Sequence, residues 1–180
     1  GVMTLRNAMK QSCDTYFYEI ARKLGVDRLN KTALKFGLGE KVLKETFENE
    51  KKGLMPSTKW KKNTLGKGWV IGETLITGIG QGYIQTTPLQ LCLMTAQLAN
   101  GGYKIYPKIS INDNDDSFED IRSIIKKNSK IPKKIKGGLS EATEKIFNFN
   151  KEKKYERLYK NSKNIKIIQE AMFASTNELR

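Results

Sequence analysis

Histidine is absent from this chain of 180 residues. A Ser-His-Asp or Cys-His catalytic set therefore cannot be completed within it. Any acid–base chemistry must be carried out by lysines or carboxylates, whose pKa values would have to be shifted by burial or by neighbouring charges.

Cysteine is scarce as well, since Cys13 and Cys92 are the only two. They lie far apart and form no CxxC pair, which argues against a zinc site. Each stands in an apolar helical pattern, so we expect two buried free thiols, and the spacing alone leaves a disulfide open.

Long apolar runs are missing too. No stretch approaches the length of a membrane helix, about 18 residues or more, and no signal peptide is visible. Because Gly1 is not an initiator Met and Arg180 falls within an expected helix, we expect both ends to be cut from a longer protein. The missing membrane segment therefore says nothing about where the intact protein lies.

Positive charge is in excess, with 33 Lys and Arg against 19 Asp and Glu and a net charge of +14. Such a charge suggests nucleic acid or an anionic surface. The aromatic residues mostly stand at core spacing rather than among the lysines, which favours solvated basic faces. A basic, non-catalytic RNA-binding domain stays open as an alternative, but we expect no nucleic-acid partner.

Apolar periodicity predicts helices in the first part of the chain. A short helical signal covers residues 5–11, and another helix is predicted from Asp27 to a stop at residues 37–39. Between them, Asp14 is expected as an N-cap and Gly25 as a C′ glycine. The buried face of that middle helix is predicted from a stripe of four residues: Phe17, Ile20, Ala21 and Leu24.

The region after residue 39 is expected to be irregular at first. Residues 40–68 predict a charged surface excursion with a few anchoring aromatics such as Trp60. Residues 78–83 (GIGQGY) predict a glycine-rich loop, and residues 87–90 (TPLQ) predict a helix start with a capping box. That helix is apolar nearly all round, so we expect it deep in a core with four residues buried: Leu89, Leu93, Met94 and Leu98.

The second half of the chain is less regular. Residues 103–111 alternate weakly and predict a strand. A charged stretch follows, for which we expect solvated loop with one or two short helices, one of them at residues 140–147. Residues 164–177 predict a last amphipathic helix.

Three short motifs could carry chemistry. Residues 78–83 do not fit a dinucleotide loop, because Tyr83 stands where glycine is required and no P-loop lysine follows. Residues 123–126 (SIIK) match S-x-x-K but lie in the charged stretch, and we interpret them as a chance match. Residues 12–14 (SCD), taken alone, would be ordinary capping residues.

In their order along the chain, however, four segments closely resemble the penicillin-binding protein 2 family, the class B transpeptidases of cell elongation. These segments are residues 12–19 (SCDTYFYE), 36–39 (FGLG), 78–90 (GIGQGYIQTTPLQ) and 99–102 (ANGG). The resemblance implies an α+β fold: a partial penicillin-binding transpeptidase (serine β-lactamase-like) domain, mainly its helical part, with an incomplete sheet.

One partial domain over residues 1–180 is implied. Residues 1–110 match well, residues 111–163 form a divergent, charged, loop-rich insertion, and residues 164–180 return to a domain helix.

The resemblance also implies site residues. The family uses three motifs: S-x-x-K with the nucleophile, S-x-N and K-[ST]-G. By position, residues 12–14 are the second, and the other two are expected outside this chain. Ser12 would relay protons, since a hydroxyl both donates and accepts. Asp14 stands where Asn is more general, and a carboxylate favours the ammonium form of a lysine, so Asp14 is expected to orient by accepting hydrogen bonds.

Six further residues are expected to frame the active-site cleft rather than to act in catalysis. They are Gly78, Gly80, Gln81, Gly82, Tyr83 and Thr87.

The implied activity is that of a serine D,D-transpeptidase that cross-links peptidoglycan through D-Ala-D-Ala stem peptides, binds penicillin and maintains cell shape. No metal or organic cofactor is implied. The implied partners are stem peptides, β-lactams, a membrane-embedded glycan polymerase and elongation-complex proteins. The intact protein would lie in the inner membrane with this domain facing the periplasm, and the fragment alone is expected to be inactive. A division-type relative is the nearer alternative, although it usually carries Asn at the position of Asp14.

Overall fold

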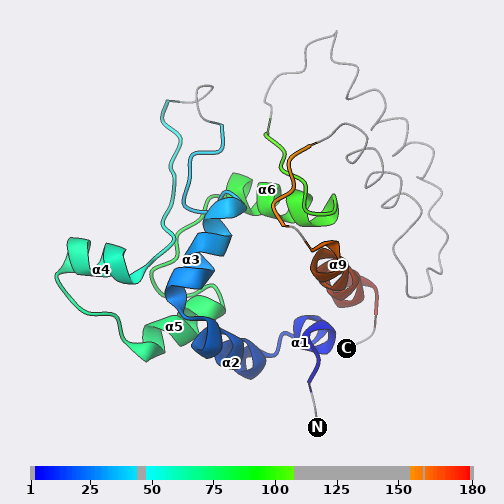
Figure 1. Cartoon of the computed structure of the whole chain (residues 1–180), viewed down its shortest axis with the longest axis horizontal. Coiled ribbons are helices and arrows are strands. Elements are labelled where there is room, and N and C mark those ends of the chain that lie inside the picture. Colours follow the sequence, from blue (N-terminus) through cyan, green and yellow to red (C-terminus); the bar gives the residue numbers. More distant parts are fainter. Residues whose placement is uncertain (1–2, 44–47, 108–154, 160, 179–180) are drawn as a thin grey trace.

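The computed structural model describes residues 3–43, 48–107, 155–159 and 161–178 (Figure 1). Helices dominate these ranges, and extended chain pairs in them only as isolated bridges. The described helices are α1 (Leu5–Lys10), α2 (Asp14–Leu24), α3 (Val26–Lys35), α4 (Thr58–Leu65), α5 (Ile71–Gly78), α6 (Pro88–Ala99) and α9 (Ser162–Asn177).

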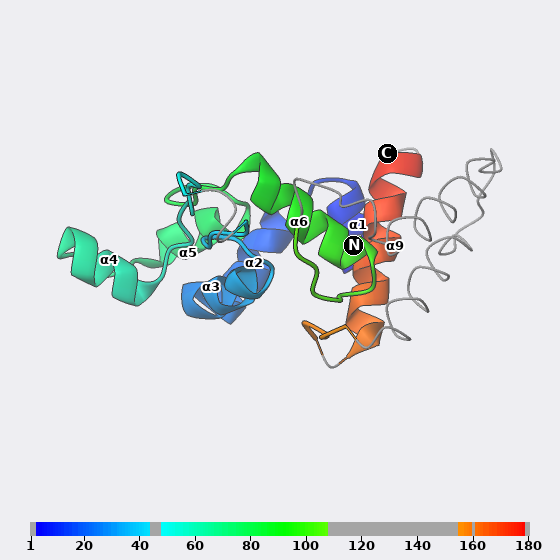
Figure 2. The ribbon, with the colours of Figure 1, turned by 90° about the horizontal axis from the view of Figure 1, so that it is seen from above.

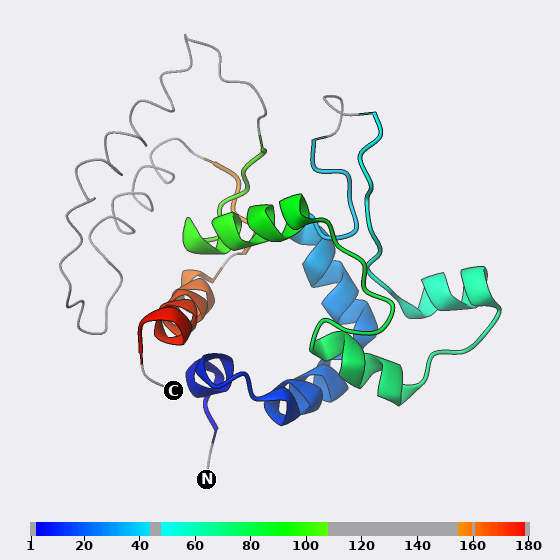
Figure 3. The same cartoon turned by 180° about the vertical axis from the view of Figure 1, so that it is seen from behind.

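The helices follow one another around an open ring, seen from behind in Figure 3. Helix α1 packs against α9, α2 packs against α5 and α3, and α6 packs against α9. The contact between α1 and α9 brings the two ends of the chain together, and there Arg6 and Lys10 both pair with Glu178. Helix α4 projects from one end of the molecule (Figure 2).

Helix α2 forms where the periodicity predicts it, but two details differ. Its N-cap is Cys13, and Asp14 is the first helical residue. The prediction that Asp14 caps the helix is therefore wrong, although its charge still suits the helix N-terminus. Of the predicted buried stripe, Ala21 is buried, whereas Ile20 and Leu24 are 36% and 41% exposed. Periodicity identifies an apolar face but not what covers it.

Helices α4 and α5 are missing from the sequence-based prediction. Helix α4 interrupts the expected irregular stretch: Ser57 caps it by accepting a hydrogen bond from the Trp60 amide at 3.1 Å, and Gly66 ends it with φ +66°. Helix α5 begins where Glu73 accepts from the amide of Val70 at 3.0 Å. Gly78, expected in a loop, is the last residue of α5.

Helix α6 starts as predicted, with Thr87 and Gln90 in a capping box and Pro88 in its first turn. The expectation that it lies deep in a core is only partly met. Leu93 is buried, but Leu91 is 45% exposed, and Leu89, Met94 and Leu98 are of intermediate exposure. Among the described segments that contact this helix are α9, the chain near Phe36 and residues 40–52, and Ile105, whose amide donates to Gln97, yet much of the helix remains uncovered.

Gln90 fastens α6 to a distant loop. Its side chain is fully buried, and its amide nitrogen donates to the carbonyl oxygens of Glu40 at 2.7 Å and Lys52 at 2.8 Å. Its amide oxygen accepts from the Thr87 amide at 3.0 Å. One buried side chain thus bonds to three backbone groups, and a group that loses its partner in such a part-buried place is costly.

The chain after α6 meets the returning segment before α9. Tyr103 and Arg157 form an isolated antiparallel bridge, flanked by a hydrogen bond from the Lys104 amide to the Glu156 carbonyl at 2.8 Å. The strand predicted over residues 103–111 is thus a single bridge in its described part. The short helix predicted at residues 140–147 lies outside the described residues, and the last predicted helix is confirmed as α9.

Both cysteines are free. The expectation that they are buried is wrong: Cys13 is half-buried and Cys92 is exposed. Within the described ranges, no group of three or more His, Cys, Asp or Glu residues could hold a metal ion. None of the helices described is long and apolar enough to cross a membrane.

Helices α2 and α5 approach each other closely because Gly78 has no side chain. A Cβ at this position would lie 2.4 Å from the Cβ of Ala21 and 3.2 Å from the carbonyl oxygen of Phe17. We therefore expect Gly78→Ala to lower the free energy of unfolding by about 1–3 kcal/mol, as overpacking does. Urea unfolding of the chain measures this.

Gly72 in the same helix provides the matched control, because no heavy atom lies within 4 Å of a Cβ built there. Gly72→Ala should raise the free energy of unfolding by about 0.4–1 kcal/mol, since it restricts the unfolded chain. Equal effects of the two substitutions would contradict the close contact between α2 and α5.

Gln90 supplies a second test of the fold. Gln90→Met keeps the length of the side chain but leaves the carbonyls of Glu40 and Lys52 without their donor, so the free energy of unfolding should fall by about 1–3 kcal/mol. Gln85 is exposed and serves as the control, since Gln85→Met should change the free energy of unfolding by no more than about 0.5 kcal/mol. Equal melting temperatures for these two variants would show that the buried hydrogen bonds add nothing.

Candidate active site

Ser12 lies in the tight turn between α1 and α2. The amide of Ser12 donates to the carbonyl of Met9 at 3.3 Å, and the amide of Cys13 donates to the carbonyl of Ala8 at 2.9 Å. These two bonds are those of a Schellman motif, whose C′ residue adopts a left-handed conformation and is usually glycine. Ser12 is that C′ residue, with φ +51°.

Three other helices end with the same pair of hydrogen bonds, and each has glycine at the C′ position. Those residues are Gly37 after α3, Gly80 after α5 and Gly101 after α6. Within the described ranges, Ser12 is the one residue other than glycine with a positive φ. A left-handed backbone costs an L-residue about 1–2 kcal/mol, so serine is a less stable choice than glycine here.

The side chains of Ser12 and Asp14 are both exposed. Neither makes a hydrogen bond to any described residue, whereas Cys13 between them contacts the Thr15 hydroxyl at 3.3 Å. The hydrogen bond with Thr15 and that from the Tyr16 amide lower the pKa of the Cys13 thiol. The turn therefore presents a hydroxyl and a carboxylate to solvent, one on each side of the residue that caps α2.

The residues expected to frame a cleft fall in two groups. Gly78 packs directly on α2, the helix that begins after Ser12. The other five lie further along the chain: Gly80 and Gly82 with φ +79° and +78°, exposed Gln81, half-buried Tyr83, and Thr87 at the cap of α6. Contact between α2 and α5 thus links the two predicted regions, but no hydrogen bond described joins Ser12 to the loop.

Sequence reasoning missed a charged cluster beside this loop. Lys61 of α4 is 5% exposed and forms an ion pair with Glu73 of α5. Tyr83 donates its hydroxyl to Glu73 at 3.3 Å. Only the aromatic residues around Lys61, namely Trp60 and Trp69, could have signalled it in the sequence.

Burial raises the pKa of Glu73, but the hydrogen bond from Lys61, the bond from the Val70 amide and the charge of Lys61 together outweigh this and place the pKa below its usual value. Glu73 is therefore ionised at neutral pH. The stability contributed by this lowered pKa is lost as the pH falls through it.

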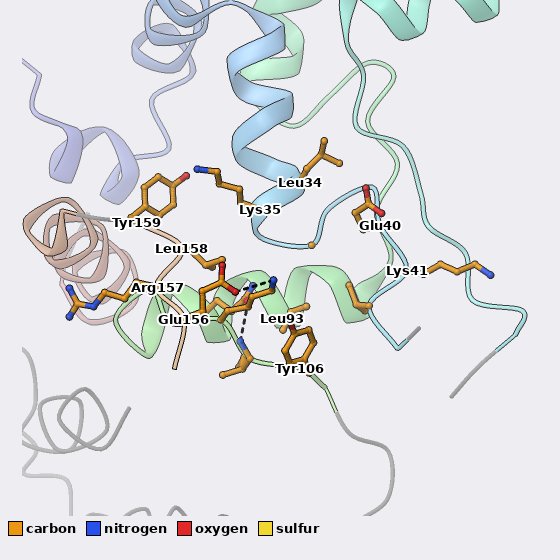
Figure 4. A pocket seen from close by; sticks show the side chains of 15 residues that line it. Leu34, Lys35, Glu40, Lys41, Leu93, Tyr106, Glu156, Arg157, Leu158 and Tyr159 are labelled. Carbon is orange, nitrogen blue, oxygen red and sulfur yellow. Dashed lines mark hydrogen bonds and ion pairs between the residues drawn. The ribbon is translucent and has the colours of Figure 1, made fainter. Parts of the chain in front are cut away.

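A cavity of about 680 Å³ lies elsewhere, between the end of α3, one face of α6 and the paired segments at residues 104–106 and 156–159 (Figure 4). Its walls include Leu34 and Leu93, and at its rim Lys104 pairs with Glu156 at 3.4 Å. None of the predicted site residues lines it, so this cavity is separate from the Ser12 turn.

Comparison with protein families gives one match over nearly the whole chain. The family model described as penicillin binding protein transpeptidase domain matches residues 1–176.

Curated relatives agree with this match. The chain is 39% identical over 109 residues to peptidoglycan D,D-transpeptidase MrdA of Acinetobacter baumannii, covering 61% of this chain and 16% of that protein. It is 34% identical over 116 residues to the protein of the same name from Escherichia coli K12, covering 64% of this chain and 18% of that protein. The chain thus spans less than a fifth of the length of these relatives.

Solved structures show the same fold. Pseudomonas aeruginosa PBP2 in complex with WCK 5153 is 51% identical, with a TM-score of 0.55 over 58% of this chain and 23% of that one. Helicobacter pylori PBP2 in complex with MreC has a TM-score of 0.70 over 98% of this chain and 26% of that one, at 24% identity, and supports the fold alone.

The turn itself gives a prediction about stability. Ser12→Gly should raise the free energy of unfolding by about 0.5–1 kcal/mol, because glycine adopts the left-handed conformation without strain. Ser12→Ala, which keeps the strain and removes only the exposed hydroxyl, should change it by no more than about 0.5 kcal/mol. Thermal unfolding of both variants measures this difference in stability. A Ser12→Gly protein that is no more stable than Ser12→Ala would show that the turn is unstrained.

Proposed function

The chain belongs to the penicillin-binding protein transpeptidase domain family, and on that premise we propose that the protein carrying it is a serine D,D-transpeptidase that cross-links peptidoglycan during cell elongation. The described residues are mainly the helical part of that domain, as the sequence predicts, with two isolated bridges in place of a sheet. The division into residues 1–110, 111–163 and 164–180 remains a prediction.

The conformation of Ser12 is the observation that carries the proposal. The chain places serine where α3, α5 and α6 place glycine, and the serine hydroxyl makes no bond that would stabilise the described structure. Strained residues of this kind cluster at functional sites. By the resemblance, residues 12–14 also stand where the family has its second catalytic motif, which supports a chemical role for the exposed hydroxyl.

The proposed reaction has two steps. A nucleophilic serine of the first motif, outside this chain, attacks the carbonyl carbon of the penultimate D-Ala, and the terminal D-Ala leaves after its nitrogen gains a proton. An amine of a neighbouring stem peptide then attacks the acyl-enzyme, loses a proton and releases the serine. Ser12 would pass these protons, accepting one and donating another. Asp14 would orient the groups by accepting hydrogen bonds.

Penicillin would acylate the same nucleophile, because its ring amide takes the place of the scissile peptide bond. Cell-shape maintenance, a membrane-embedded glycan polymerase as partner and a periplasmic position of the domain on the inner membrane belong to the same proposal. The Helicobacter pylori protein was solved as a complex with MreC, and an elongation-complex protein is among the partners proposed here. Membership of a transpeptidase family also disfavours the RNA-binding alternative.

This chain alone should form no covalent adduct with a fluorescent penicillin, because its one S-x-x-K match, residues 123–126, is interpreted as a chance match and its sequence contains no K-[ST]-G motif. Gel fluorescence and intact-mass spectrometry measure this, and a longer protein that spans all three motifs is the positive control. A stable adduct that peptide mapping places on Ser123 would overturn both this prediction and the interpretation of residues 123–126.

In that longer protein, Ser12→Ala should slow acylation by penicillin by about 10²–10⁴-fold, the usual contribution of a positioned proton-transfer group. Its melting temperature should barely change. Gln11, an exposed neighbour, is the control, and Gln11→Ala should leave acylation unaltered. Asp14→Asn should slow acylation less than Ser12→Ala does, since Asn keeps the shape of the side chain and can still accept hydrogen bonds. Normal acylation per folded molecule of Ser12→Ala would refute the relay role.

A further inference from the structure

A single carboxylate joins three segments that are separate in the sequence. The Oε1 atom of Glu73 pairs with the ammonium of Lys61 and accepts a hydrogen bond from the hydroxyl of Tyr83 at 3.3 Å. Its Oε2 atom accepts from the amide of Val70 at 3.0 Å. The start of α5 is thereby fastened both to α4 and to the glycine-rich loop that follows α5.

Aromatic rings enclose this ion pair. The Lys61 ammonium lies 5.8 Å from the centroid of the Trp69 ring and 6.0 Å from that of Tyr83. Trp60 closes the group, with its ring 5.2 Å from that of Tyr83. The side chains of Lys61 and Glu73 are only 6% and 14% exposed. A pair this buried often adds little net stability, but its geometry is specific, because neither charge can move without losing its partner.

Helix α5 connects this cluster to the predicted catalytic turn. Glu73 lies in the first turn of α5, and Gly78 at its other end has no room to slide along α2. Helix α2 begins two residues after Ser12. A shift of the start of α5 would therefore be passed to α2, because close-packed helices do not deform independently.

We propose that Lys61 and Glu73 are a positioning pair for the transpeptidase reaction: they fix how α5 lies on α2 and so hold Ser12 in the orientation that proton transfer requires. This inference rests on the proposed function. Neither residue touches the reacting groups, and both act through the contact between α5 and α2. A misplacement of about 1 Å can slow an enzyme about 10²-fold, so a modest loosening is enough.

The first experiment separates positioning from stability. Lys61→Met leaves the buried carboxylate of Glu73 without its cationic partner and is expected to fold poorly, whereas the double variant Lys61→Met with Glu73→Gln removes both charges and keeps the acceptor for Val70. In the longer protein, the double variant should regain most of the melting temperature that Lys61→Met loses. Its acylation by fluorescent penicillin should nevertheless remain about 10- to 100-fold slower than that of the unsubstituted protein. Lys62→Met, at the exposed next residue of α4, should match the unsubstituted protein. Normal acylation in the double variant would overturn the proposal.

The second experiment does not depend on the reaction. Hydrogen exchange of the amides at residues 12–17 should be faster in the double variant than in Lys62→Met. Faster exchange confined to residues 57–83 would show that the pair has only a local role and would overturn the proposal even if acylation fell. If the unsubstituted longer protein is not acylated at all, the proposed function fails, and exchange at residues 12–17 alone decides whether the pair positions the turn.

Discussion

The close approach of α5 to α2, made possible by Gly78 against Ala21, is the contact on which the rest of the arrangement depends. One of these helices begins just after Ser12, and the other carries Glu73 in its first turn and leads into the glycine-rich loop. This contact is the most extensive described link between the helix that follows the Ser12 turn, where the second motif is predicted, and the helix that leads into the loop expected to border the cleft. A contact between backbones this close has little freedom to slide, so it can transmit position as well as stability.

Two features of the chain lower its stability, or add little to it, and are explained by the proposed function. Ser12 occupies a helix-ending position that glycine would occupy with less strain, and Lys61 and Glu73 bury charges that apolar residues could replace. Ser12 precedes α2 by two residues and Glu73 lies in the first turn of α5, so each feature adjoins one of the two helices in contact. Natural proteins depart from the locally best residue mainly at functional sites, which agrees with the roles proposed for Ser12 in proton transfer and for Lys61 and Glu73 in positioning.

Local signals could predict local structure. The capping box at Thr87 and Gln90 predicted the start of α6, and apolar periodicity predicted α2 and α9. Helix α4 was missed because its residues are mostly polar, and it is held by tertiary contacts such as that of Asp27 with Thr58. Burial of Cys92 was predicted wrongly, since an apolar pattern does not reveal whether another element covers it. Resemblance placed Ser12 in a catalytic motif, but nothing in the sequence showed its left-handed backbone.

The central claim is that Ser12 transfers protons at the reacting centre. A crystal structure of the longer protein, trapped as the acyl-enzyme of a β-lactam, tests it most directly. The account predicts that the Oγ atom of Ser12 lies within about 2.6–3.2 Å of the nucleophile's oxygen or of the former lactam nitrogen of the opened ring. The φ angle of Ser12 should still be positive. A Ser12 hydroxyl directed away from the adduct, with other groups bonded to both of those atoms, would contradict it.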